Sequence, residues 1–86
     1  MIALDIETYD PNLKELGDGS IRKDGEILCC GSYNGKKAEV YIPNTPGWQK
    51  LIDILKSDEP KIFHNGIYDL AWLCCGYNLK VNGTIH

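Results

Sequence analysis

The 86-residue sequence has no apolar run long enough to span a lipid bilayer, which takes about 20 consecutive apolar residues. It also lacks the basic segment followed by an apolar segment that forms a secretory signal. We therefore expect a soluble protein that works in the cytoplasm and has no membrane partner.

An excess of positive charge is absent too, since the formal net charge is −3 and the pI is about 5.2. A broad basic surface of the kind that attracts nucleic acid is thereby excluded. Any binding of nucleic acid would have to use a local patch or metal ions.

No C-x-x-C pair occurs, because the four cysteines form two adjacent pairs, Cys29-Cys30 and Cys74-Cys75. Neighbouring strand residues point to opposite faces, which suits four thiolates on one zinc poorly. We expect the cysteines to act as small apolar residues in a reducing cell. The alternative, a zinc-held module, predicts stoichiometric zinc in the purified protein.

The length and the 43% hydrophobic content indicate one small domain with a modest core. Residues 2–7 read as a strand, and the polar residues 8–24 as a long connection. Two strands near 26–33 and 37–42 flank Asn34-Gly35, a strong hairpin signal. Thr45 and Pro46 begin a helix that should end near Ser57.

The remaining chain predicts a short strand at "KIFHN" (residues 61–65), a helix over 66–76 and a last strand over 80–85. This order predicts a mixed α/β sheet in which the first and fourth strands are parallel neighbours. Two apolar stripes at helical spacing should face the core, and Trp48 and Trp72 should also be core residues. The stripes are Trp48, Leu51, Ile52 and Leu55, then Ile67, Leu70, Ala71 and Cys74.

The stretch "LDIETYD" (residues 4–10) places Asp5 and Glu7 on one face of the first strand. Paired carboxylates are costly unless a cation or water reaches them. His64 and Asn65 follow the fourth strand, and Asp69 lies one helical turn later, off the apolar stripe. The carboxyl ends of parallel strands meet at one edge, so all three acids should converge there.

Carboxylate oxygens without a majority of thiols or imidazoles suit Mg²⁺ or Mn²⁺. Two such ions, about 4 Å apart, activate water and stabilise the leaving oxygen in phosphoryl displacement. Alternatives remain open: Asp5 and Glu7 could lie on a solvated face beside lysines, His64 could be a packing residue, and Asn65 could cap the helix.

Together, "LDIETYD" and "FHNGIYDLAWL" resemble the first two motifs of the DEDD superfamily of proofreading exonucleases, and the resemblance covers essentially the whole chain. It is strongest to the exonuclease domain that begins bacteriophage-type family A DNA polymerases. The patterns D-x-E-T and HN-x-x-x-D are matched at Asp5, Glu7, Thr8, His64, Asn65 and Asp69.

The resemblance implies a ribonuclease H-like fold, two divalent ions and removal of nucleotides from the single-stranded 3′ end of DNA, in a phage's host cytoplasm. Asp5, Glu7 and Asp69 would bind the metal, and Glu7 would also orient the attacking water. Thr8 and Asn65 would contact the terminal nucleotide, while Tyr9 would stack on a base or be an ordinary loop aromatic.

The family's third motif, which supplies a fourth acid, does not occur among these residues. Residues 1–86 therefore resemble the first part of a 3′–5′ exonuclease domain, incomplete at its C-terminus, whose partner is the remainder of the polymerase chain. Weak metal binding and poor hydrolysis are expected. The alternatives are a stand-alone DEDD exonuclease acting on RNA or DNA, and an inactive fragment that forms a homo-oligomer to hide its uncovered sheet.

Overall fold

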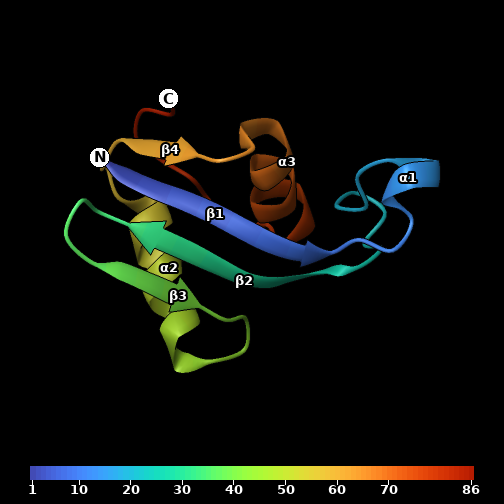
Figure 1. The fold of residues 1–86 in the computed structure, drawn as a ribbon, viewed down its shortest axis with the longest axis horizontal. Coiled ribbons are helices and arrows are strands. Elements are labelled where there is room, and N and C mark those ends of the chain that lie inside the picture. The colour runs from blue at the N-terminus through green and yellow to red at the C-terminus, as the bar shows by residue number, and fades with distance from the viewer.

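A computed structural model describes residues 1–86, and its centre is a four-stranded mixed sheet in the order β3-β2-β1-β4 (Figure 1). The long strand β1 (Ile2–Tyr9) pairs antiparallel with β2 (Glu26–Tyr33) and parallel with β4 (Lys61–Phe63). At the edge, β3 (Ala38–Tyr41) pairs antiparallel with β2. The mixed α/β sheet and its parallel pair are thus confirmed.

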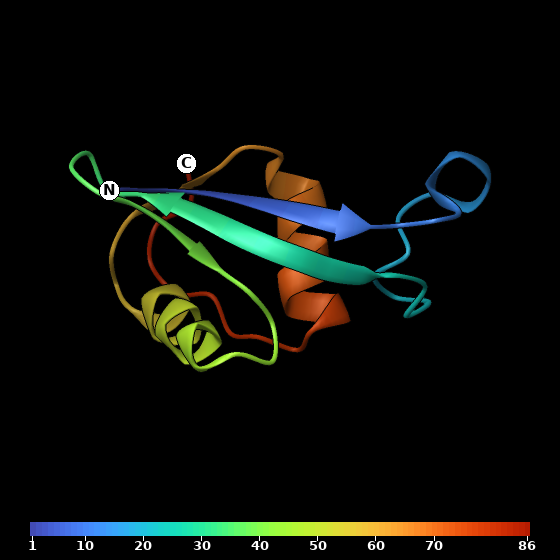
Figure 2. The same ribbon diagram turned by 60° about the horizontal axis from the view of Figure 1, so that its bottom comes forward.

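Both main helical segments lie on one face of this sheet, and no helix covers the other (Figure 2). They are α2 (Pro46–Lys56) and α3 (Gly66–Leu70), which η1 (Ala71–Gly76) continues as a wider π-helical turn. The connection between β1 and β2 carries the short helix α1 (Leu13–Leu16) and projects beyond the end of β1. None of these helices has the length and apolarity needed to cross a membrane.

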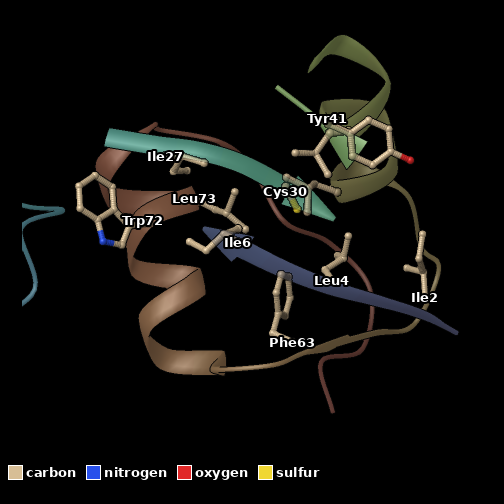
Figure 3. Close-up of a cluster of buried hydrophobic side chains, with 11 residues drawn as sticks. Ile2, Leu4, Ile6, Ile27, Cys30, Tyr41, Phe63, Trp72 and Leu73 are labelled. Atoms are coloured by element: carbon tan, nitrogen blue, oxygen red, sulfur yellow. The ribbon is translucent and has the colours of Figure 1, made fainter. Parts of the chain in front are cut away.

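The core forms between the sheet and these helices because β1 alternates strictly between buried and exposed residues from Ile2 to Glu7. Ile2, Leu4 and Ile6 point toward the helices, and their neighbours point to the uncovered face (Figure 3). Trp72 is 1% exposed, as predicted for a core residue, while Trp48 packs partly buried at the margin. The core consists of Ile2, Leu4, Ile6, Ile27, Cys30, Tyr41, Leu51, Leu55, Phe63, Trp72 and Leu73.

The predicted hairpin at Asn34-Gly35 is confirmed. The Asn34 side-chain oxygen accepts hydrogen bonds from the backbone N–H groups of Lys36 and Lys37, each at 2.9 Å. Gly35 has a φ of 95°, which only glycine adopts without strain. An Asx-type turn therefore connects β2 and β3.

Helix α2 begins at Pro46 after Thr45 and ends before Ser57, as predicted, although the Thr45 hydroxyl donates to the carbonyl of Ile42 at 2.7 Å and caps no backbone N–H. The expected last strand is wrong. Residues 80–85 form no strand, and only an isolated bridge joins Ile85 to Lys61. Asn82 bonds instead to the end of α2, and after Gly83 only Thr84 and His86 form backbone hydrogen bonds with β4, both to Lys61.

The side of α3 that faces the core also differs from the prediction. Ile67 is 90% exposed, and the predicted stripe lines an open apolar hollow instead of the core. Asp69, Trp72 and Leu73 are the buried residues of these turns. The segment turns the face that carries Trp72 toward the core, because burying an indole removes more apolar area from water than burying the smaller residues of the predicted stripe.

Candidate acidic site at the free edge of β1

An acidic hollow of about 360 Å³ opens along β1 beyond the end of β4. The strand β4 stops at Phe63, which pairs with Leu4, so the rest of β1 has a strand neighbour only on its β2 side. The residues that follow β4 and the start of α3 form the opposite wall. The hollow is lined by Asp5, Ile6, Glu7, Thr8, Leu13, His64, Asn65, Tyr68 and Asp69.

Six of the seven site residues predicted from the sequence meet at this hollow. The strand β1 supplies Asp5, Glu7 and Thr8. The turn after β4 and the helix α3 supply the others. Tyr9 is the exception, since it is 57% exposed and does not line the hollow. The six brought together are Asp5, Glu7, Thr8, His64, Asn65 and Asp69.

Asp69 is 2% exposed, although its position off the apolar stripe had suggested that packing would not involve it. Burial raises the pKa of its carboxyl group above 3.8, and the negative charges of Asp5 and Glu7 raise that pKa further. The backbone N–H of Asn65, 3.3 Å from its Oδ2 atom, and the nearby His64 act in the opposite direction. Asp69 therefore lies within the field of both β1 acids.

No lysine or arginine lines the hollow, and neither Asp5 nor Glu7 forms a salt bridge. The alternative in which lysines pair with these two acids is therefore not what the structure shows. A buried carboxylate beside two exposed carboxylates, with no lysine or arginine in the lining, is electrostatically unfavourable, and a bound positive ion would stabilise it.

The carboxylates of the hollow are oxygen ligands that suit a hard divalent cation, but they do not surround one binding position. No group of three or more His, Cys, Asp or Glu side chains lies close enough together to hold an ion. Mg²⁺ typically binds through one or two carboxylates together with waters and substrate phosphate oxygens. The chemistry of Asp5, Glu7 and Asp69 suits that open kind of site, in which one or two of the carboxylates bind the ion and water and substrate complete the coordination.

Tyr68 is a residue of this hollow that the sequence analysis missed. Its hydroxyl lies 2.7 Å from the Thr8 hydroxyl and donates to the Asp10 carboxylate at 3.0 Å. Burial raises the pKa of Tyr68, so the phenol keeps its proton at neutral pH. Its place directly before Asp69 in the second motif was the only signal in the sequence.

His64 and Asn65 are exposed at the mouth of the hollow. Asn65 precedes α3, but its side chain makes no capping hydrogen bond; its backbone N–H binds Asp69 instead. Both side chains are thus free to meet a ligand.

The cysteines do not gather into a site. Cys30 is a core residue, and burial raises the pKa of its thiol to about 12. Cys75 is exposed, and Cys29 and Cys74 are half-buried. Cys30 thus plays the apolar role expected from the sequence.

A larger and mostly apolar hollow, of about 620 Å³, lies on the uncovered face of the sheet. It shares Asp5 and His64 with the acidic hollow, so the two are neighbours. Its floor includes Ala3, Tyr33, Ala38, Val40 and Ile62.

Comparison of the sequence with protein-family models found no matching family, and a search of curated proteins found no significant match. What the hollow does must therefore be argued from its geometry and from the two motifs that line it.

Proposed function

We propose that this chain carries the metal site of a 3′–5′ exonuclease that removes nucleotides from the 3′ ends of single-stranded DNA. The observation that carries the proposal is the meeting of Asp5 and Glu7 with the buried Asp69 at one hollow that no lysine or arginine lines. The two exonuclease-like motifs supply these acids. Mg²⁺ or Mn²⁺ is the proposed cofactor, with two ions in the complete site.

The proposed roles follow the positions of the side chains around the hollow. Asp5, Glu7 and Asp69 bind the metal, and Glu7 also orients the attacking water. A bound metal ion lowers the pKa of water and stabilises charge on the phosphate.

The terminal nucleotide occupies the remainder of the hollow. Thr8, His64 and Asn65 border the space that it would fill. Tyr9, exposed just outside the hollow, offers its ring to a neighbouring base, because aromatic stacking tolerates any sequence.

We further propose that the fold is ribonuclease H-like and that residues 1–86 are the first part of the exonuclease domain of a phage-type family A polymerase. The remainder of that polymerase chain would then cover the apolar sheet face. The fourth acid of the family site is not among these residues. We accordingly expect them to bind metal weakly and to hydrolyse DNA slowly on their own.

Binding of Mn²⁺, followed by calorimetry and by the electron paramagnetic resonance of the free ion, tests the metal site directly. Wild-type protein should bind Mn²⁺, and Asp5→Ala and Asp69→Ala should abolish binding. Asp58→Ala, which removes an exposed acid after α2, is the matched control and should bind normally. Absence of Mn²⁺ binding at millimolar concentration, or binding that survives both site variants, would refute the proposal.

A 5′-labelled single-stranded oligonucleotide tests the reaction itself. We expect slow, Mn²⁺-dependent shortening from the 3′ end that Asp5→Ala removes. A parallel RNA oligonucleotide decides between the DNA exonuclease and the RNA-directed alternative. Shortening that Asp5→Ala leaves intact would contradict the assignment of this site.

The uncovered sheet face favours a second candidate, a non-enzymatic module that self-associates through that face. Val40 and Tyr33 are 68% and 51% exposed there, and exposed apolar patches commonly mark interaction sites. Sedimentation equilibrium would show a stable oligomer without metal-dependent activity if this candidate is correct.

A further inference from the structure

The half of β1 that carries the acids has a neighbouring strand on one side only, and its pairing with that strand is irregular. Its register with β2 shifts between Glu7 and Thr8, so that Glu7 pairs with Cys29 and Thr8 with Ile27. Such a bulge locally disrupts the ladder of hydrogen bonds. On the other side β4 has already ended opposite Leu4. Some other contact must hold this end of β1 against α3.

The Tyr68 side chain makes that contact. Its hydroxyl lies 2.7 Å from Thr8 Oγ1, at the bulge, and 3.0 Å from Asp10 Oδ2, just beyond β1. A phenol has one proton, which Tyr68 donates to Asp10, so the Thr8 hydroxyl must donate to the Tyr68 oxygen. Each hydrogen bond of this series therefore has a defined direction, with Thr8 donating to Tyr68 and Tyr68 donating to Asp10.

The same contact extends into the connection that follows β1. The backbone N–H of Gly19 donates to Asp10 Oδ2 at 3.1 Å. A Cβ atom at Gly19 would lie 2.7 Å from Asp10 Oδ1 and 2.2 Å from the carbonyl oxygen of Asp24, so only glycine fits. Asp10 thereby ties the loop, the end of β1 and α3 together.

We propose that Tyr68 is a positioning residue that fixes the distance between the acids of β1 and Asp69 by locking the end of β1, opposite the bulge that Leu28 makes in β2, to α3. Tyr68 is adjacent to Asp69 in the chain, and Thr8 is adjacent to Glu7. The hydrogen bond between Tyr68 and Thr8 therefore joins the residue next to Asp69 to the residue next to Glu7. The inference rests on the proposed metal site and adds a residue that controls its geometry.

Removal of a group that orients metal ligands typically lowers metal affinity by about 10–100-fold. We expect Tyr68→Phe to weaken Mn²⁺ binding by about tenfold. Thr8→Val should act similarly, Thr8→Ser should retain wild-type affinity, and the double variant Tyr68→Phe/Thr8→Val should be no worse than either single variant. Additive losses, or unchanged affinity in Tyr68→Phe, would overturn the proposal.

Tyr41→Phe is the matched control because it also removes a phenol hydroxyl that contacts one hydroxyl and one carboxylate. The Tyr41 hydroxyl lies 3.0 Å from the Ser32 hydroxyl and donates to the Glu39 carboxylate at 2.7 Å, and Tyr41 does not line the acidic hollow. It should lower the melting temperature at least as much as Tyr68→Phe does, yet leave Mn²⁺ affinity unchanged. Equal losses of affinity in both variants would show a general structural effect and overturn the positioning role.

Amide hydrogen exchange without metal tests the lock independently of the proposed function. Tyr68→Phe should speed exchange at residues 7–9 and leave exchange in β3 unchanged. If wild-type protein binds no Mn²⁺, the metal site fails while this measurement still decides whether the lock exists. Unchanged exchange at residues 7–9 would overturn the lock whether or not metal binds.

Discussion

At the scale of single residues, Asp69 is poorly suited to its surroundings as long as no cation is present. It is almost fully buried, it faces two further acids, and its carboxylate accepts one hydrogen bond, from the backbone N–H of Asn65 at 3.3 Å. Such arrangements are common at functional sites, where a group is kept for its chemistry and at a cost in stability.

This arrangement predicts that Asp69→Asn stabilises the metal-free protein. Because the folded pKa of Asp69 is raised, the folded state holds its proton more tightly, and stability falls as pH rises through that window. At pH 7 the variant should melt a few degrees higher, since about 1 kcal/mol corresponds to roughly 4–8 °C in a domain of this size. Thermal denaturation by circular dichroism in EDTA measures the change.

The gain from Asp69→Asn should shrink near pH 3, where the wild-type carboxyl is itself protonated. Glu15→Gln, at an exposed acid of α1 that forms no salt bridge, serves as the control and should leave the melting temperature unchanged. A lower melting temperature for Asp69→Asn at pH 7 would contradict this account of the site.

At the scale of elements, polar side chains supplement the small hydrophobic core by joining strands to helices at the margins of the sheet. The buried Lys61 ammonium donates to the carbonyl oxygens of Ser57, Glu59 and Asn82 at 2.7–2.8 Å, and so ties the end of α2 and the final segment to β4. On the far side, Glu39 of β3 binds Lys50 of α2 at 2.9 Å.

Glu39 should make the contact between β3 and α2 sensitive to acid. Lys50, the Tyr41 hydroxyl and Lys37 lower the pKa of Glu39 to about 2. The resulting stabilisation is present above the ordinary pKa of 4.5 and is lost as pH falls toward 2. Urea denaturation should therefore find Glu39→Gln less stable than wild type at pH 6 and equal to it near pH 2.

Glu15→Gln in the exposed α1 is the matched control for Glu39→Gln and should show no difference at either pH. An equal deficit of Glu39→Gln at pH 6 and at pH 2 would mean that the charge of Glu39 does not stabilise this contact.

At the scale of the whole molecule, the helices cover only one face of the sheet (Figure 2). The other face leaves Tyr33, Val40 and Ile62 between 42% and 68% exposed, around the apolar hollow that adjoins the acidic one. A second apolar hollow lies along Ile67 and Ile85. These surfaces distinguish the 86 residues from a fully enclosed domain.

The uncovered face should bind the dye ANS, whose fluorescence reports exposed apolar surface. Val40→Lys should lower that fluorescence clearly because it places a charge in the middle of the hollow. Leu16→Lys, at an apolar residue that is 61% exposed in α1, is the control and should change it little. Equal fluorescence in Val40→Lys and wild type would show that this face does not present the apolar surface described.

Local patterns were sufficient to predict much of this architecture. Residues 2–7 indicated a strand, the two-residue period of a strand placed Asp5 and Glu7 on one face, and Asn34-Gly35 indicated the hairpin. The proximity of Asp69 to those acids followed from the parallel order of β1 and β4. Each inference used residues close in the chain or a general rule for joining strands.

By itself, then, the sequence determined the order of the elements up to residue 76 and the edge at which the acids meet, because side-chain period and turn chemistry act over a few residues. Only the tertiary structure decided which side of α3 is buried, that Lys61 lies within the core, and that Tyr68 reaches Thr8 and Asp10. Both sides of the 66–76 segment are apolar, so periodicity could not choose between them. The choice depended on packing Trp72 and on hydrogen bonds between residues far apart in the chain.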